Sequence, residues 1–211
     1  MSARDDVLAR IRSANATAAV ATPPPVPRDY APHGSLGPGS DEAVDLLEDR
    51  LVDYKATVSR TDRAGVAAAV AAALGNARRV VVPPGLPDDW VGADGPEAVV
   101  DDGALTSHQL DELDGVVTAA TVACAVTGTI VLDGSPDQGR RAVTLVPDLH
   151  VCVVRHDQVV HTVPEMLGRL EPTRPLTFIS GPSATSDIEL ERVEGVHGPR
   201  TLHVVLLVPD R

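Results

Sequence analysis

The segment "SGPSATSDIE" (residues 180–189) combines hydroxyl groups, a Gly-Pro pair and two carboxylates directly after a short apolar run. A strand that leads through a glycine-containing loop into a helix N-terminus is a common anion-binding place in α/β proteins, because backbone N–H groups point at the ligand there. We therefore expect Gly181, Pro182, Ser183 and Thr185 to contribute to a ligand site.

The carboxylates of this segment have a second explanation. Ser186 is followed three residues later by Glu189, which is the spacing of a capping box at a helix start. Asp187 near the first turn would also complement the helix dipole. Both explanations stay open, so Asp187 and Glu189 are acid/base candidates only if this chain carries out chemistry.

Three further segments have side chains or backbone suited to ligand binding or catalysis. The segment "TGT" offers the hydroxyls of Thr127 and Thr129 around Gly128, although a hairpin with strand-favouring threonines would look the same. His197 lies between two glycines in "GVHGPR" and is a catalytic candidate, yet a lone loop histidine is more often a surface residue. Arg141 could pair with a carboxylate or phosphate, but exposed arginines usually have no specific partner.

These candidates must be positioned by alternating helices and strands, which is typical of α/β proteins. Helices are expected over residues 2–14, 40–60, 61–77 and 162–170, and in a segment that includes 187–192. Residues 107–113 are expected to form a helix or part of a turn-rich crossover. Strands are expected over residues 78–85, within 115–134, in two runs within 141–160, and over 175–180 and 200–208. Residues 16–40 hold six prolines, so we expect an N-terminal helix and Pro-rich arm (1–40) followed by one α/β domain (41–211).

The bulk properties exclude several classes of protein. The net charge is −12 and no dense arginine cluster offsets it, which argues against nucleic acid and anionic membranes as partners. No apolar run reaches the roughly 18–20 residues that span a bilayer, and the N-terminus lacks an apolar signal core, so we expect a cytoplasmic protein.

The cysteines and the missing motifs narrow the chemistry further. Cys124 and Cys152 lie in apolar, strand-like segments and are expected to be buried, reduced thiols. A metal or iron–sulfur site held by this chain alone is not expected, since there is no C-x-x-C pair and no metal-type histidine spacing. The common nucleotide-binding and hydrolase motifs are also absent.

Taken together and in this order, "TGTIVLDGSPDQGRRAVTLVPDLHVCVV", "SGPSATSDIE" and "GVHGPRTLHVVL" resemble the lactate utilization protein C family, the LUD-domain proteins. The resemblance is strong over residues 110–210 and extends to the N-terminal segments. It implies an open α/β sheet with helices on both faces, as in the glucosamine-phosphate deaminase, ribose-phosphate isomerase and CoA-transferase fold group. It also implies that "TGT" and "SGPSATSDIE" lie at the carboxyl ends of strands.

The resemblance further implies a role in oxidising L-lactate to pyruvate with iron–sulfur partner proteins, with no cofactor bound by this chain. One residue departs from the family pattern: many members read "AETGT", whereas Val126 stands here in place of the acidic residue. An independent sugar-phosphate isomerase or CoA-transferase-like enzyme is the alternative, and a CoA transferase would need a nucleophilic glutamate. A non-catalytic assembly subunit that grips a partner through residues 1–40 is the third hypothesis.

Overall fold

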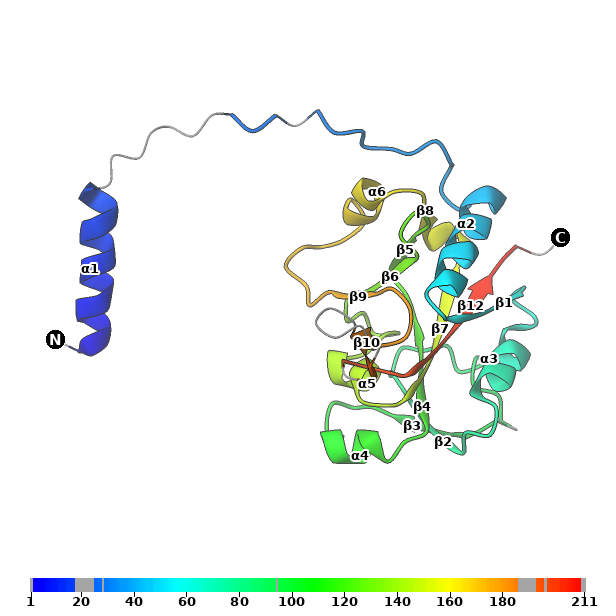
Figure 1. Ribbon diagram of the computed structural model, residues 1–211. Coiled ribbons are helices and arrows are strands. Elements are labelled where there is room, and N and C mark those ends of the chain that lie inside the picture. Colours follow the sequence, from blue (N-terminus) through cyan, green and yellow to red (C-terminus); the bar gives the residue numbers. More distant parts are fainter. Residues whose placement is uncertain are drawn as a thin grey trace. The chain divides into compact units, whose positions relative to one another are not determined.

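A six-stranded parallel sheet forms the centre of the larger part of the protein (Figure 1). The computed structural model describes residues 2–17, 25–27, 29–93, 95–185, 193–195 and 197–209. The chain divides into two compact units, Met1–Tyr30 and Ala31–Arg211. The smaller unit contains α1 (Ala3–Thr17), which matches the helix expected over 2–14 and has no buried side chain.

The strand order of the central sheet is β1-β12-β7-β4-β2-β3, and every neighbouring pair is parallel. The inner strands are runs of valine and leucine because both faces of the sheet are covered. The strands are β1 (Thr57–Thr61), β2 (Arg79–Val82), β3 (Glu97–Val100), β4 (Gly115–Ala119), β7 (Leu149–Arg155) and β12 (Thr201–Leu207).

Helices pack on both faces of this sheet, as expected from the sequence. Successive side chains of a strand point to opposite faces. Leu206 of β12 accordingly packs in one cluster with Leu47 of α2, whereas its neighbour Val205 packs in another with Val70 of α3. The helices of the larger unit are α2 (Asp41–Asp53), α3 (Val66–Leu74), α4 (Ser107–Asp111), α5 (Arg141–Leu145) and α6 (Val163–Leu167).

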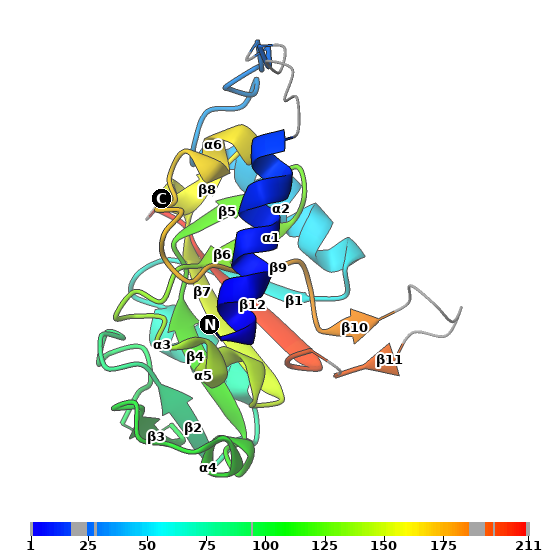
Figure 2. The same ribbon diagram turned by 90° about the vertical axis from the view of Figure 1, so that its left-hand side faces the viewer.

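Two smaller sheets accompany the central one. A four-stranded sheet has the order β8-β5-β6-β9, in which β5 and β6 form an antiparallel hairpin. Figure 2 shows β9 leading into β10, which pairs with β11. The strands are β5 (Val122–Cys124), β6 (Thr129–Leu132), β8 (Val159–Val160), β9 (Thr177–Ile179), β10 (Ala184–Thr185) and β11 (Val193–Glu194), and η1 (His156–Gln158) is a single 3₁₀ turn.

The start of α2 follows from its sequence. The Ser40 side chain accepts a hydrogen bond from the backbone N–H of Ala43, which satisfies one of the free donors at the helix start. Leu47 and Leu51 are fully buried one turn apart, so the period of the apolar residues is that of the helix. Both features confirm the prediction of a helix that begins after Ser40.

Two predicted elements are wrong. The expected helix over 40–60 ends at Asp53, and its tail is instead strand β1, because Lys55 takes a left-handed φ of 72° and residues 57–61 pair with β12. The segment that begins at Arg141 was expected to be a strand but forms α5. There Val143 packs against the α4 side of the core, so tertiary packing overrides the strand preference of its β-branched residues.

The thiols agree with the prediction. Cys124 and Cys152 are free and buried, and burial raises the pKa of the Cys152 thiol to about 12. Such a thiol is uncharged and unreactive at neutral pH. Among the helices that the structure describes, none is long and apolar enough to cross a bilayer.

Candidate functional site

A cavity of about 230 Å³ lies at the amino ends of β7 and β12. His150 and Leu202 are the second residues of these strands and belong to its wall. Strand β9 and the loops on either side of the β10–β11 pair complete the enclosure. The wall consists of Thr144, Leu145, His150, Thr177, Phe178, Ile179, Ser180, Gly181, Pro182, Ser183, His197, Gly198, Pro199 and Leu202.

Three hydrogen bonds join the two loops. The backbone N–H of Ser183 donates to the carbonyl oxygen of Pro199 (2.8 Å), and the N–H of Gly195 donates to the carbonyl oxygen of Ser183 (3.0 Å). The N–H of His197 donates to the Ser183 hydroxyl oxygen (2.9 Å). That oxygen acts as an acceptor here, so the Ser183 O–H can still donate to a ligand.

His150 contributes a neutral rather than a charged surface to the cavity. Its side chain is 1% exposed, and its Nε2 atom lies 2.8 Å from the hydroxyl of Thr118. Burial lowers the pKa of His150 to about 4. The imidazole is therefore neutral at physiological pH, and it offers an anion no positive charge.

An ion pair holds the loop that precedes β12 against the start of β7. Arg200 makes a two-pronged contact with Asp148, with Nε 2.7 Å from Oδ1 and Nη2 2.8 Å from Oδ2. The hydrogen bonds from Arg200 lower the pKa of Asp148. This contact orients the backbone around His197, whose side chain is exposed at the rim.

Packing explains two of the predicted glycines without a ligand. Gly181 has a φ of 88°, and a Cβ atom there would lie 2.7 Å from the backbone oxygen of Tyr54. Gly128 has a φ of 61°, and a Cβ atom there would lie 2.8 Å from Cβ of Arg50. Both residues thus have to be glycine because the C-terminal end of α2 approaches them.

The structure brings four of the predicted site residues together: Gly181, Pro182, Ser183 and His197 all line the cavity. The "TGT" segment lies at the turn and the start of β6 in the β5–β6 hairpin, and it contacts the cavity wall without lining the cavity. Thr127 donates to the hydroxyl of Thr129 (2.8 Å), which lies 2.8 Å from the hydroxyl of Ser180. These hydroxyls hold the start of the loop rather than line the cavity.

The remaining predicted residues lie elsewhere. Arg141 lines a hollow beside the carboxyl end of β3, away from the cavity. Val126 is 46% exposed and does not line the cavity either. Thr185 belongs to β10, but its side chain lies outside the described residues, as do Asp187, Glu189 and the expected helix start at Ser186.

The position of the cavity differs from the expectation. The loop after Ile179 does follow the carboxyl end of β9 in the four-stranded sheet. It folds, however, over the amino ends of β7 and β12 in the parallel sheet. The reason is that β9 belongs to the second sheet, so its exit does not share the direction of the parallel strands.

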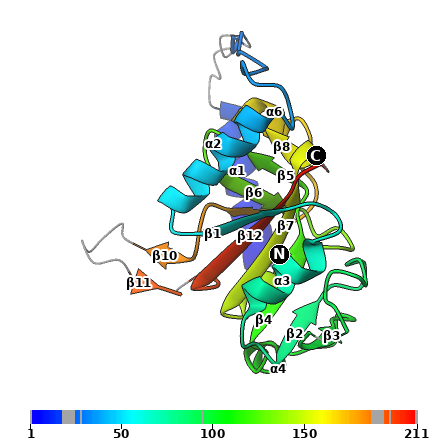
Figure 3. The ribbon, with the colours of Figure 1, turned by 90° about the vertical axis from the view of Figure 1, so that its right-hand side faces the viewer.

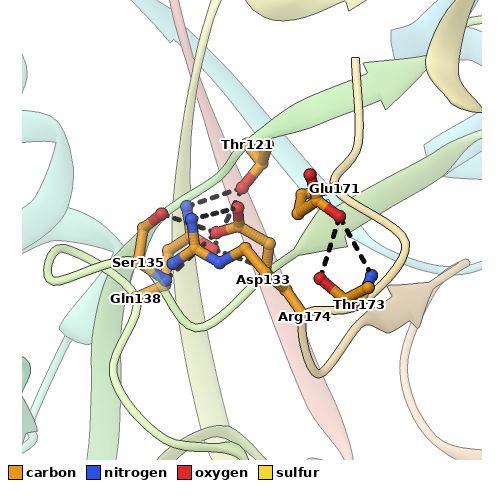
Figure 4. A network of polar contacts seen from close by, with 7 residues as sticks. All are labelled: Thr121, Asp133, Ser135, Gln138, Glu171, Thr173 and Arg174. Carbon is orange, nitrogen blue, oxygen red and sulfur yellow. Dashed lines mark hydrogen bonds and ion pairs between the residues drawn. The ribbon is translucent and has the colours of Figure 1, made fainter. Parts of the chain in front are cut away.

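Sequence reasoning missed a polar network just after the carboxyl ends of β4 and β6, shown in Figure 4. Asp133 is 6% exposed and accepts hydrogen bonds from the Ser135 hydroxyl (2.6 Å) and the Ser135 N–H (3.0 Å). Arg174 contributes an ion pair of 3.0 Å to the other carboxylate oxygen. Burial alone would raise the pKa of Asp133, but these partners and Thr121 outweigh it and lower the pKa.

Two neighbouring turns support this network. The Gln138 side chain accepts from the backbone N–H of Asp133 (2.7 Å) and donates to the hydroxyl of Thr121 (2.9 Å). The Thr173 hydroxyl donates to Glu171 (2.8 Å) just before Arg174 (Figure 4). The signal in the sequence was the run "LDGSPDQGRR", in which polar side chains gather between two glycines. Within the described ranges, no group of three or more His, Cys, Asp or Glu side chains is placed to hold a metal ion.

Comparison with known proteins places the chain in a family. The profile of the LUD domain matches residues 42–207. The chain is 49% identical over 170 residues to Lactate utilization protein C of Deinococcus radiodurans, covering 79% of this chain and 80% of that protein. It is 26% identical over 198 residues to Lactate utilization protein C of Bacillus subtilis, covering 83% and 82%. A crystal structure of a DUF162 family protein from Deinococcus radiodurans is similar with a TM-score of 0.67 at 40% identity, covering 79% of this chain and 96% of that one. The chain therefore belongs to the LUD-domain family.

Proposed function

We propose that this chain is a component of a lactate-utilization system and takes part in the oxidation of L-lactate to pyruvate together with iron–sulfur partner proteins. Two curated relatives named Lactate utilization protein C each match about four fifths of the chain, which supports the role in lactate utilization. In this proposal the partner proteins carry the electrons, and this chain binds a small anionic ligand of the pathway.

The cavity beside Ser183 is the observation that carries the ligand proposal. Pockets for drug-sized ligands usually measure about 300–1,000 Å³. The volume here is about 230 Å³, which suits a small organic acid such as lactate or pyruvate. The wall combines apolar side chains with a few polar groups, the usual composition of a small-molecule site.

The residues of the cavity have two roles: some form hydrogen bonds with the ligand, and others define the shape of the site. Ser183 donates its O–H to a ligand oxygen, while the bond from the His197 N–H fixes the orientation of that hydroxyl. His197 offers a ring nitrogen at the rim. His150 stays neutral and forms part of the cavity wall, so selectivity for an anion comes from hydrogen bonds rather than from a buried positive charge. Asp187 and Glu189 remain the acid/base candidates for any chemical step on this chain.

Thermal unfolding of the purified chain tests the ligand proposal. The probes are L-lactate, pyruvate, coenzyme A and ribose 5-phosphate, measured on the parent, on Ser183→Ala and on Ser107→Ala, an exposed serine of α4 that serves as the control. A ligand at 100 times its Kd stabilises the native state by about 2.7 kcal/mol. We expect a rise in Tm with lactate or pyruvate that Ser183→Ala reduces and Ser107→Ala keeps. A rise in Ser183→Ala as large as that of the parent would contradict the assignment of the site.

Growth tests the pathway independently. Cells that lack the protein should fail to grow on L-lactate but should grow on pyruvate, and the parent chain should restore growth on lactate. Normal growth on lactate without the protein would refute the proposal. Recovery of iron–sulfur proteins with the tagged chain from lactate-grown cells tests the partners.

A second function, assembly, is favoured by one observation. Helix α1 forms a unit of its own with the arm and has no buried side chain, although Val7 and Ile11 are apolar and about half exposed. Such a helix gains stability from packing against another surface. Deletion of residues 1–30 should then abolish recovery of the partners without changing the Tm of the remaining domain.

A further inference from the structure

The carboxyl ends of β2 and β4 form a crevice that the site above does not use. The two strands are neighbours in the sheet, but the chain leaves them in opposite directions (Figure 3). It runs from β2 outward to β3, and from β4 back toward β7. In open α/β sheets, ligands bind at such a point, because the diverging loops leave a crevice outside the strand ends.

A hollow of about 420 Å³ occupies this crevice. The loop between β6 and α5 covers part of it and is held there by backbone hydrogen bonds. The N–H of Gly85 donates to the carbonyl oxygen of Pro136 (2.9 Å), and the N–H of Ala119 donates to the carbonyl oxygen of Asp137 (3.0 Å). The hollow is thus preformed, and its lining is Gly85, Ala120, Thr121, Ser135, Pro136, Asp137, Gln138, Arg155 and Gln158.

Asp137 has a carboxylate oxygen without a partner in this hollow. Its Oδ1 atom is fully buried, and no described residue donates a hydrogen bond to it. Burial raises the pKa of Asp137, and this outweighs the opposite influence of its own N–H, of Arg155 and of Gln138. Leaving a buried acceptor unpaired is costly in a folded protein, and the same carboxylate group lines the hollow.

The neighbouring amides each have partners elsewhere in the loop or strand. Gln138 is held by Thr121 and by the backbone of Asp133, as described above. The side chain of Gln158 donates to the carbonyl oxygen of Ala120 and accepts from the N–H of Arg155. Both amides therefore build the wall and keep their orientation.

Arg155 gives the same hollow a positive charge. It is the last residue of β7, and its Nε lies 3.0 Å from Asp157. The Arg155 and Asp157 side chains are 45% and 59% exposed, so this ion pair is weak and can be exchanged for another anion. The hollow thus offers the Asp137 carboxylate as a hydrogen-bond acceptor. It also offers Arg155 as a cation that can exchange Asp157 for the carboxylate of a ligand.

We infer that the hollow between the ends of β2 and β4 binds a small 2-hydroxy acid, whose hydroxyl donates to the Asp137 carboxylate and whose carboxylate pairs with Arg155. The choice of a hydroxyl rather than an ammonium group as the donor rests on the proposed function. The site is separate from the cavity beside Ser183, which lies at the other end of the strands.

Calorimetric titration of the full chain tests this inference with L-lactate and with propionate, which lacks the hydroxyl. The variants are Asp137→Asn and Arg155→Gln, with Asp88→Asn and Arg63→Gln as matched controls on exposed residues. A hydrogen bond to a charged group is worth about tenfold or more in affinity. We expect the parent and both controls to bind L-lactate at least about tenfold more tightly than propionate.

The variants separate the two contacts. Asp137→Asn should reduce the difference between lactate and propionate, because an amide oxygen is a weaker acceptor than a carboxylate, whereas Arg155→Gln should weaken both ligands by a similar factor. A purely structural role of Asp137 would leave the ratio of the two affinities unchanged, and that result would overturn the inference. Tighter binding of L-alanine than of L-lactate would overturn the hydroxy-acid assignment.

The growth test distinguishes this inference from the proposed function. If the parent shows no preference for lactate while growth on lactate still requires the protein, the inference fails and the pathway role stands. If growth does not require the protein, the proposed function fails, whatever the titration shows.

Discussion

The two ends of the parallel sheet differ in whether their polar groups have hydrogen-bond partners. At the amino ends of β7 and β12, loops joined by hydrogen bonds enclose a cavity, and the glycine at Gly181 is explained by the approach of α2. At the carboxyl ends of β2 and β4, nearly every polar group is also satisfied, yet Asp137 keeps one buried oxygen without a partner. Residue types thus pointed to the first loop, whereas the unsatisfied oxygen of Asp137 directs attention to the second.

The same contrast recurs within one loop. Asp133 and Asp137 are four residues apart, but their pKa values are shifted in opposite directions. Hydrogen bonds from Ser135 and the ion pair with Arg174 outweigh the burial of Asp133, while burial prevails at Asp137. One carboxylate stabilises the loop, and the other is held at a cost to stability.

The largest effect on stability is expected at the amino-end loop. Gly181→Ala places a side chain at a φ of 88° and 2.7 Å from the backbone of Tyr54. Left-handed strain and overpacking together should lower the free energy of unfolding by about 2–4 kcal/mol. Urea denaturation measures this change. Gly37→Ala, where a Cβ atom has nothing within 4 Å, is the control and should change little. An equal loss in both variants would refute the packing explanation.

The next largest effect belongs to Asp133. Asp133→Asn removes the ion pair with Arg174 and weakens the bonds from Ser135, which should cost about 1.5–3 kcal/mol at pH 7. Because the folded-state pKa is lowered, this stabilisation is present above the ordinary pKa of 3.8 and is lost as the pH falls through the folded value. Urea unfolding of parent and variant from pH 7 to pH 3 should therefore converge toward low pH. A difference that stays constant over this range would contradict the charge-based origin.

Asp137 should show the opposite sign. Its folded-state pKa is raised, so ionising the folded protein costs stability that grows as the pH rises above 3.8 and levels off above the folded value. Asp137→Asn removes this cost and should raise the free energy of unfolding by up to about 1 kcal/mol at pH 7. The gain should vanish toward pH 3. A loss of stability at pH 7 would show that the carboxylate is structurally required and would weaken the comparison with Asp133.

The smallest effect is expected at Ser183. Its hydroxyl accepts one hydrogen bond, from the N–H of the exposed His197, so Ser183→Ala should change the free energy of unfolding by no more than about 0.5–1 kcal/mol. Unfolding in urea without ligand measures this. A loss as large as that of Gly181→Ala would indicate that Ser183 serves the fold, and its effect on ligand binding could then not be assigned to contact with the ligand.

Much of the fold could be predicted from local pattern. The N-cap Ser40 and the spacing of Leu47 and Leu51 predicted α2, Pro164 in the first turn predicted α6, and the apolar run after Thr201 predicted β12. The errors occurred where contacts between distant segments decided the element. Strand β1 depends on pairing with β12, and α5 depends on packing of Val143, and neither partner is close in sequence.

The candidate site was predictable only in part. The segment around Ser183 and His197 was found by residue type, and the fold does place the two together. The "TGT" segment contacts the cavity wall only through Ser180, and Arg141 lies elsewhere. Asp137 was missed because its significance lies in the lack of a donor, which no spacing of residues can reveal.

The sequence by itself determined the alternation of helices and strands, the burial of both cysteines and the membership of the LUD-domain family, since these depend on local periodicity, apolar content and motif order. Only the tertiary structure decided which end of the sheet each loop covers and which of two nearby carboxylates has partners. Such decisions depend on residues far apart in the chain that meet in the fold, because hydrogen bonding and burial are properties of the three-dimensional surroundings of an atom.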